Sequence, residues 1–195
     1  MYFKNLIRKD GVALKVSLAN VHLPVRLGHK NAKQLFAEPL NDQLCATGRG
    51  SVMDCSIRKR HSGQIIGVDL YLGLTDASKG GLRVVAQMLE ALSAPCGSSI
   101  RLPDGTNDPL VFGRAEGLEV AVETQHLHDP DAGRDLVATC RDAINDLGVS
   151  RGWDERADHT RAYFYGENFE AMRDMVETIL EDHPQYHGAY LKRLA

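Results

Sequence analysis

Two histidines past the middle of the chain are the residues best suited to chemistry. His126 and His128 form a His-x-His pair, and Asp129 and Asp131 follow directly. In an extended segment the two imidazoles share one side, and imidazole combined with carboxylate suits zinc or another transition metal. No third ligand is marked, and Asp129 also fits the N-cap of the helix expected next. His126, His128 and Asp131 therefore support a metal-dependent hydrolase as an alternative interpretation.

Three tyrosines are the second set of candidates. Tyr163 and Tyr165 flank Phe164 in a predicted strand. With Phe164 in the core, both tyrosines lie on the opposite sheet face, and Tyr71 can lie near them. Some RNA-binding sheets stack bases on such aromatics, but their aromatic-and-basic motif is absent from this sequence. Tyrosine is also enriched at protein-binding hot spots. We expect either a protein-binding face or a face covered by the N-terminal segment or by a homodimer partner.

Other patterns that resemble catalytic motifs have simpler explanations. Gly48-Arg49-Gly50-Ser51 precedes a strand, whereas phosphate-binding loops run from a strand into a helix. The sequence contains no Gly-x-Ser-x-Gly elbow and no His-Glu-x-x-His pair. The four cysteines are scattered without a CxxC spacing and are expected to be reduced and buried. We predict no cofactor.

Strict alternation of apolar and polar residues predicts the strands around these side chains. Segments 53–58 and 66–74 alternate in this way and are joined by a short charged loop, which predicts a hairpin with Tyr71 on its wet face. Segment 118–123 predicts a further strand with one wet face. Such alternation is typical of antiparallel sheets that are covered on one face only.

Three segments carry apolar residues at helical spacing and predict amphipathic helices, namely 82–92, 136–147 and 169–180. Residues 63–165 then have the order β-α-β-β-α-β, which is the ferredoxin-like plan. Within that stretch, the polar residues 149–160 predict a connection without a strand. The closing segment 161–195 adds a further unit. We predict an α+β fold: an antiparallel sheet with helices mainly on one face, and a ferredoxin-like βαββαβ body with an extra βα unit.

The N-terminal residues 1–44 predict a β-rich lead-in. An Asp10-Gly11 turn between apolar runs predicts a hairpin. Residues 21–27 alternate again, although Pro24 limits that segment to an edge strand or extended coil. The predicted domains are therefore a lead-in at 1–44 and an α+β domain at 45–195.

Composition limits the class of protein. With 43% hydrophobic and 25% charged residues, the 195-residue chain has an ordinary soluble globular composition. A net charge of -3 gives no general attraction to nucleic acid. No apolar run approaches the ~18–20 residues that span a bilayer, and the N-terminus lacks the apolar core of a secretory signal. We expect a cytoplasmic protein without a membrane or nucleic-acid partner.

Three segments carry a resemblance to a known group of proteins. The strand ending GVDLYLGL, the link ALSAPCGSSIRL and the closing FYG before an acidic helix resemble small uncharacterised bacterial proteins found among immunity proteins of contact-dependent or polymorphic toxin systems. The resemblance covers roughly residues 45–195 and implies a non-catalytic protein that neutralises a cognate toxin by binding it.

We predict that such a partner meets an acidic, tyrosine-bearing surface made of Tyr71, Glu119, Glu123, Tyr163 and Tyr165. Charge complementarity to a basic toxin would speed the encounter. Two other hypotheses differ in class. One is the metal-dependent hydrolase described above. The other is a small-molecule sensor domain, which follows from the ferredoxin-like fold by analogy alone.

Overall fold

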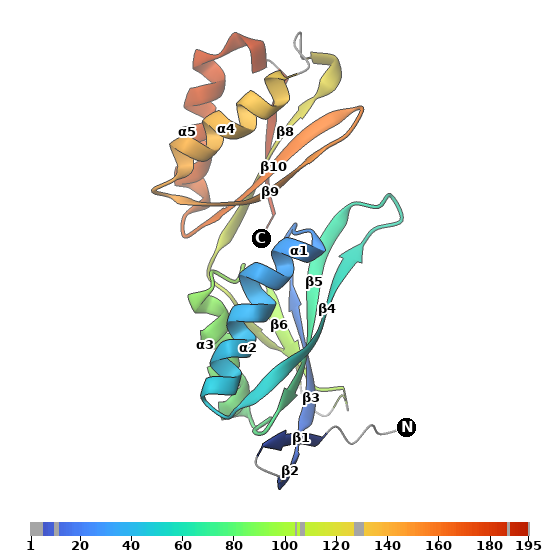
Figure 1. Ribbon diagram of the computed structural model, residues 1–195. Helices are drawn as coiled ribbons and strands as arrows, with labels where there is room; N and C mark the ends of the chain where they lie inside the picture. Colours follow the sequence, from blue (N-terminus) through green and yellow to red (C-terminus); the bar gives the residue numbers. More distant parts are fainter. Residues whose placement is uncertain are drawn as a thin grey trace. The chain divides into compact units, whose positions relative to one another are not determined.

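The computed structural model describes residues 6–9, 12–103, 105, 108–126, 131–186 and 188–194. The chain divides into two compact units, Met1–Gly113 and Arg114–Ala195, here called unit 1 and unit 2 (Figure 1). None of the helices in the described part combines the length and the hydrophobicity that crossing a bilayer requires.

Unit 1 is built on a five-stranded antiparallel sheet in the order β4-β5-β3-β6-β7. Its elements in chain order are β3 (Ser17–Leu23), α1 (His29–Ala32), η1 (Lys33–Ala37), α2 (Glu38–Ala46), β4 (Gly50–Lys59), β5 (Ile65–Leu74), α3 (Lys79–Ala91), β6 (Ser98–Arg101) and β7 (Leu110–Phe112). A separate hairpin pairs β1 (Leu6–Lys9) with β2 (Val12–Lys15) and confirms the hairpin predicted there; Asp10 and Gly11 lie outside the described residues.

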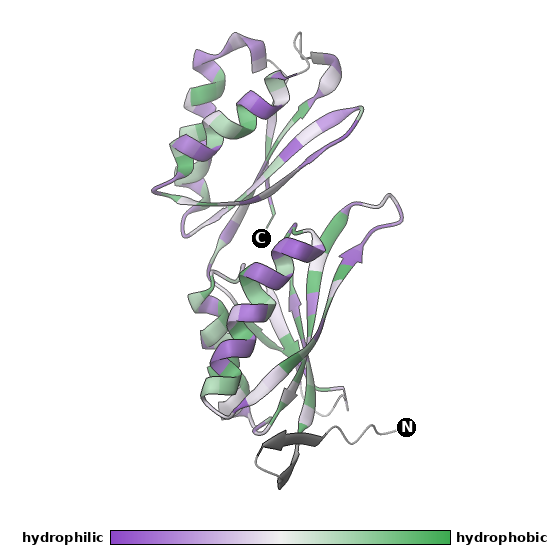
Figure 2. Cartoon of the chain, in the orientation of Figure 1, coloured by the Kyte–Doolittle hydropathy of each residue, from purple (hydrophilic) through white to green (hydrophobic). Residues whose placement is uncertain are grey.

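The stretch from β3 to β6 has the order β-α-β-β-α-β, and its strands stand in the order β4-β5-β3-β6, which is the ferredoxin-like arrangement. The helices cover one face of the sheet (Figure 1). Burial explains the packing: Val21, Leu70 and Leu72 of the central strands are fully buried, as is Leu89 of α3. Figure 2 shows hydrophilic and hydrophobic residues alternating along the helices, as expected for elements that bury one side only.

The first helical segment of unit 1 runs from α1 through η1 into α2, and its middle is a π-helix over Lys33–Ala37. Pro39 in the first turn of α2 explains the departure from α geometry. A proline has no N–H to donate, and its ring meets the carbonyl oxygen four residues back. The wider π turn relieves this conflict, while Phe36, Leu40 and Leu44 remain fully buried.

Unit 2 repeats the plan with a four-stranded antiparallel sheet in the order β11-β8-β10-β9. Its elements are β8 (Glu116–Glu123), η2 (Thr124–His126), α4 (Ala132–Ile144), β9 (Gly148–Glu155), β10 (His159–Gly166), α5 (Phe169–Asp182), η3 (Pro184–Tyr186) and β11 (Tyr190–Arg193). Its core joins β8 and β10 to both helices, with Val120, Phe164, Cys140 and Met172 all nearly or fully buried.

The predicted fold class is confirmed: the protein is α+β, with antiparallel sheets and the ferredoxin-like order. The structure places that order twice, over 17–101 and over 116–193, whereas the sequence predicts it once over 63–165. The shift arises from β9, which the sequence assigns to a connection. As an edge strand, β9 pairs with a single described strand, β10, and its tryptophan, Trp153, is 47% exposed. It therefore lacks the apolar alternation by which the other strands are predicted.

The N-terminal segment also differs from its prediction. β3 lies between β5 and β6 inside the sheet, whereas the sequence predicts an edge strand or coil because of Pro24. The strand ends at Leu23, so the proline removes no hydrogen bond from the ladder. The predicted boundary between residues 44 and 45 falls within α2, and the division between the two units comes after Gly113.

Candidate functional site

The face of the unit 1 sheet that lies opposite the helices is here called the open face of unit 1. Along β3, Val21 and Leu23 are buried toward the helices, so Asn20 and His22 belong to the open face. Tyr71 of β5 lies opposite Asn20 and is 41% exposed, which confirms its predicted place on a wet face.

Four strands bring four different polar side chains into one row across this face, here called the polar row. Tyr71 lies directly opposite Asp54 of β4 on one side and Asn20 of β3 on the other. Asn20 in turn lies opposite Arg101 of β6. Because paired strands are about 4.8 Å apart, the row runs from carboxylate through phenol and amide to guanidinium over roughly 14 Å.

A β-bulge shapes the acidic end of the polar row. The register of β4 against β5 shifts between Val52 and Asp54, which leaves Met53 as the additional residue. Bulges bend a strand and re-aim its side chains. Here the Met53 side chain lies over Gly73 of β5: a Cβ added to Gly73 would be 3.2 Å from the Met53 sulfur.

A pocket of about 580 Å³ lies along the polar row. This volume is in the range of small-molecule sites, which is roughly 300–1,000 Å³. All four residues of the row line it. The rest of its wall is mainly apolar and includes Leu18, Ala19, Met53, Leu72, Leu102 and Pro103. The pocket thus combines an apolar wall with a few polar groups of different chemistry, which is the usual composition of a binding site.

The basic end of the polar row carries the exposed guanidinium of Arg101 and the amide of Asn20. Within the described part of the chain, Arg101 forms no ion pair and no hydrogen bond through its side chain. Beside it, Asn20 Oδ1 is buried and has no hydrogen-bond partner. A buried acceptor without a donor costs about 1–3 kcal/mol, and such groups are uncommon in folded proteins. Both groups can gain from a ligand that brings an anion and a donor.

A second polar cluster lies two residues further along the same strands. Asp69 of β5 is 7% exposed, and its carboxylate accepts a hydrogen bond of 2.7 Å from His22 Nδ1. Arg58 of β4 donates to both oxygens of Asp69 at 3.0–3.2 Å. A Cβ added to Gly67 would lie 2.5 Å from His22 Cε1, so the imidazole occupies the space that the glycine leaves. Asp69, Arg58 and Gly67 therefore fix the orientation of His22.

This cluster has part of the arrangement of a catalytic triad. Ser99 of β6 lies opposite His22 on the side away from Asp69. The imidazole leans toward Gly67 instead, and no hydrogen bond joins Ser99 to His22 among the described contacts. A nucleophilic serine needs hydrogen-bond reach to its base. The cluster supplies a positioned imidazole whose Nε2 can accept a proton or a hydrogen bond.

The tyrosine and acidic residues predicted as a partner surface do not form one surface. Tyr163 and Tyr165 are buried, with 5% and 1% of their surface exposed. A cover by the N-terminal segment or by a homodimer partner stays a prediction. Glu119 is 3% exposed, and its Oε1 lies 3.5 Å from Arg161 Nε, so it cannot meet a partner as predicted. Glu123 is exposed.

Of the predicted partner residues, the two that remain exposed lie in different units: Tyr71 in unit 1 and Glu123 in unit 2. A role for either one in binding a protein partner stays a prediction. Toxin neutralisation gains no specific support from where these five residues lie.

The predicted metal ligands are described only in part. His128 lies outside the described residues, His126 ends η2, and Asp131 precedes α4. Asp131 Oδ1 accepts from Arg134 at 3.4 Å. In the part of the chain that the structure describes, no group of three or more His, Cys, Asp and Glu side chains could hold a metal ion. The metal-dependent alternative stays a prediction.

All four cysteines are described, and none forms a disulfide. Cys55 and Cys140 are buried as predicted, whereas Cys45 is exposed and Cys96 half-buried. Burial raises the pKa of the Cys140 thiol to about 12 and also raises that of Cys55. Because the thiolate is the reactive form, these two cysteines are inert side chains of the core.

Sequence reasoning missed the residues around Tyr71. His22 lies in segment 21–27, which is predicted as an edge strand or coil, and Asn20 and Arg101 belong to no motif. The available signal was the alternation of residues 18–22, but only the pairing of β3 with both β5 and β6 brings these side chains together.

No protein-family model and no curated protein matches the chain. Two solved structures share a loose similarity. The regulatory subunit of aspartate kinase from Thermus thermophilus, in a ligand-free form, is 12% identical, with 83% of this chain and 92% of that chain covered and a TM-score of 0.27. A protein described as a glycine cleavage system transcriptional repressor is 11% identical, with 91% and 95% covered and a TM-score of 0.28. At these scores neither similarity carries an argument about function.

Proposed function

We propose that this protein is a non-catalytic sensor of a small molecule and that unit 1 binds this molecule on its open face. The observation that carries the proposal is Arg101, which lacks an acidic partner among the described residues and lines an apolar pocket beside an unsatisfied amide oxygen. Arg101 is exposed and lines the pocket, so its guanidinium can be reached by the anion of a ligand.

The chemistry of the pocket defines the class of ligand. A guanidinium binds a carboxylate through two parallel hydrogen bonds, which favours a small carboxylic acid. Asn20 and Asp54 offer acceptor oxygens on the same row, so a ligand with an N–H or O–H donor near its acid group fits better than a simple fatty acid. Leu72, Leu102 and the other apolar wall residues take an apolar body.

A binding role agrees with how the nearby polar groups are used. His22 could accept a proton, but its ring is held by Asp69, and no hydroxyl or thiol among the described residues is hydrogen-bonded to it. Asp69 in turn is held by Arg58. The three side chains hold one another in place, and none of them activates a nucleophile. This arrangement is typical of a binding surface.

Titration calorimetry of the full chain against small carboxylic acids tests the proposal. The probes are apolar amino acids, each with its carboxamide and its decarboxylated amine as matched controls. We expect binding of the acids and a loss of roughly tenfold or more in the two controls, because each removes the anion that Arg101 holds.

Variants of the protein locate the site. Arg101→Gln removes the cation and is expected to weaken binding by roughly tenfold or more. Asn20→Leu removes the unsatisfied oxygen, so it is expected to weaken binding without lowering the stability of the free protein. Arg83→Gln, on the exposed side of α3, is the matched control and should bind as the parent does. Equal effects of Arg83→Gln and Arg101→Gln, or no binding of any acid, would overturn the proposal.

A further inference from the structure

A groove of about 750 Å³ lies in unit 2 between α5, η3 and β11. Its apolar floor includes Leu180 of α5, Ala189 just before β11 and Leu191 within β11, which also pack on the core. Glu177 and Glu181 stand on the helical rim. The proposed function does not use this groove, and nothing about the unit 1 pocket bears on it.

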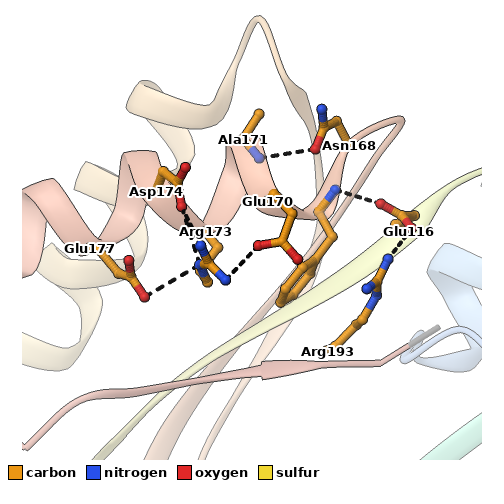
Figure 3. Close-up of polar contacts among 9 residues, drawn as sticks. Glu116, Asn168, Glu170, Ala171, Arg173, Asp174, Glu177 and Arg193 are labelled. Atoms are coloured by element: carbon orange, nitrogen blue, oxygen red, sulfur yellow. Dashed lines mark hydrogen bonds and ion pairs between the residues drawn. The ribbon is translucent and has the colours of Figure 1, made fainter.

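One end of the groove is fixed by a carboxylate that ties three elements together (Figure 3). Glu116 of β8 accepts a hydrogen bond of 2.6 Å from the backbone N–H of Phe169 at the start of α5, and it also pairs with Arg193 of β11. The Arg193 guanidinium lies over the Phe169 ring at 4.8 Å from its centre. The walls of the groove are therefore held at a set spacing before any partner arrives.

The other wall of the groove belongs to an edge strand with free backbone groups. β11 pairs with β8, and no strand in the described part of the chain pairs with its outer side. The Leu194 N–H points inward to the Gly117 carbonyl. Because successive N–H groups along a strand point to opposite sides, those of Leu191 and Arg193 point outward. An extended peptide can pair with such an edge by adding a strand.

The rim of the groove is acidic. Arg173 is surrounded by Glu170 at 2.5 Å, Asp174 at 2.7 Å and Glu177 at 3.5 Å (Figure 3). Glu181 lies one turn beyond Glu177 on the same helix and is exposed. Three carboxylates thus contact one guanidinium, and Glu181 adds a fourth carboxylate further along the helix, which leaves a net negative charge along α5. A cationic partner is attracted to this rim, and an anionic one is repelled.

We propose that this groove binds an extended peptide segment of another protein that presents apolar residues together with lysine or arginine on one face. The peptide pairs with the outer edge of β11, and every second side chain then points toward α5. Of these groove-facing side chains, the apolar ones lie over Leu180 and Leu191, and the basic ones meet Glu177 and Glu181.

Fluorescence anisotropy with a labelled peptide of about six residues, the length of an ordinary strand, tests the proposal on the full chain. The probe places leucine, lysine and leucine at every second position with serine between them, so that leucine and lysine share one face of the strand. Two isomeric forms of the probe carry N-methyl groups on alternate residues. The first form lacks the N–H groups on one edge of the peptide strand, and the second form lacks those on the other edge. We expect the unmodified probe to bind and one N-methylated isomer to lose at least roughly tenfold in affinity while the other keeps it.

Charge reversal tests the rim independently. The double variant Glu177→Lys/Glu181→Lys is expected to weaken probe binding by roughly tenfold and to reduce its dependence on salt. Asp142→Lys/Asp146→Lys, an equal change on exposed positions in and after α4, is the matched control and should bind as the parent does.

Several results would overturn the proposal. Equal losses in both double variants, or equal affinities of both N-methylated isomers, would mean general attraction between charges rather than pairing at β11. Failure of the probe to bind, together with self-association that the Glu177→Lys/Glu181→Lys variant abolishes in sedimentation, would assign the groove to a second copy of this chain. If the probe does not bind and the protein does not self-associate, the proposal is wrong.

Discussion

The ferredoxin-like parts of unit 1 and unit 2 have the same strand order, but the sheet faces that bear Tyr71 and Tyr163 carry different charged residues. Tyr71 in β5 and Tyr163 in β10 occupy equivalent positions, three residues before each strand ends. The residue opposite on the first strand of the fold is Asn20 in unit 1 and Glu119 in unit 2. Tyr71 is 41% exposed, whereas Tyr163 is 5% exposed.

The last strand completes the comparison. Arg101 lies opposite Asn20, and Lys192 lies opposite Glu119. In unit 2 the central residue is an acid that already has a cation, Arg161, within 3.5 Å. In unit 1 the central residue is a neutral amide, and Arg101 has no acidic partner among the residues that the structure describes. Unit 2 thus places a cation beside its central acid, although Glu119 Oε2 and Arg161 Nε form no hydrogen bond, whereas the described residues of unit 1 place no acid in contact with Arg101.

The largest expected effect separates the two equivalent tyrosines. Tyr163→Ala removes a buried aromatic ring and is expected to lower the free energy of unfolding by about 3 kcal/mol. Tyr71→Ala removes a half-exposed ring and should cost about 1 kcal/mol or less. Urea unfolding followed by circular dichroism measures both. Similar costs at the two positions would break the comparison between the faces.

A smaller loss of stability tests the His22 cluster, which has no counterpart in unit 2. Gly67→Ala places a methyl group 2.5 Å from His22 Cε1 and 3.0 Å from the Leu23 carbonyl oxygen. We expect a cost of about 1–3 kcal/mol, because the ring must leave its position over the strand. Gly80→Ala in α3 is the control, since outside the helix backbone the added Cβ would approach only the Ser78 hydroxyl oxygen, at 3.7 Å. It should be neutral or slightly stabilising, and an equal loss at both glycines contradicts the packing described for His22.

The sequence predicts the class of the fold because the strands with one buried and one exposed face alternate strictly. Segment 66–74 and the helices after it are confirmed with boundaries within a few residues. The division into units is not predicted, because it depends on which strands pair. β3 joins β5 and β6 across about 50 and 80 residues of chain, and no local pattern reports such long-range pairing.

The candidate site is predicted only at Tyr71 for the same reason. Asn20, Asp54 and Arg101 have no motif spacing, and they become a row only through the register of four strands. The buried state of Tyr163 and Tyr165 is also a tertiary property. Alternation assigns the sheet face of a side chain correctly, but it does not report whether that face is covered.

A change in binding tests the charge comparison directly. Asn20→Glu gives unit 1 the acid that unit 2 has, and the introduced carboxylate lies opposite Arg101. We expect the affinity for small carboxylic acids to fall by roughly tenfold or more, because the ligand must compete with an internal anion. Asn20→Gln keeps the amide without the charge and is the matched variant in the same calorimetric titration. Equal losses in both variants would assign the effect to shape and not to charge.

The smallest expected effect concerns how the helix after each unit's third strand begins. In unit 1, Ser78 Oγ accepts from the Gly81 N–H at the start of α3. In unit 2, α5 has a neutral cap, Asn168, and also the Glu116 carboxylate (Figure 3). The hydrogen bond from the Phe169 N–H lowers the pKa of Glu116 below its ordinary value of 4.5, and Arg193 adds to the same shift.

Because the pKa of Glu116 is lower in the folded state, its contribution to stability is complete above pH 4.5 and is lost as the pH falls through the folded value. Glu116→Gln should therefore destabilise the protein at neutral pH, and the difference from the parent should disappear in acid. Asn168→Ala removes a cap that does not titrate, so its cost of about 1 kcal/mol should persist at both pH values. Urea midpoints of the three proteins at neutral pH and well below pH 4.5 measure this. If the Glu116→Gln difference persists in acid as the Asn168→Ala difference does, the carboxylate acts through its shape alone, and the charged tie between β8, α5 and β11 is not what holds the end of the groove.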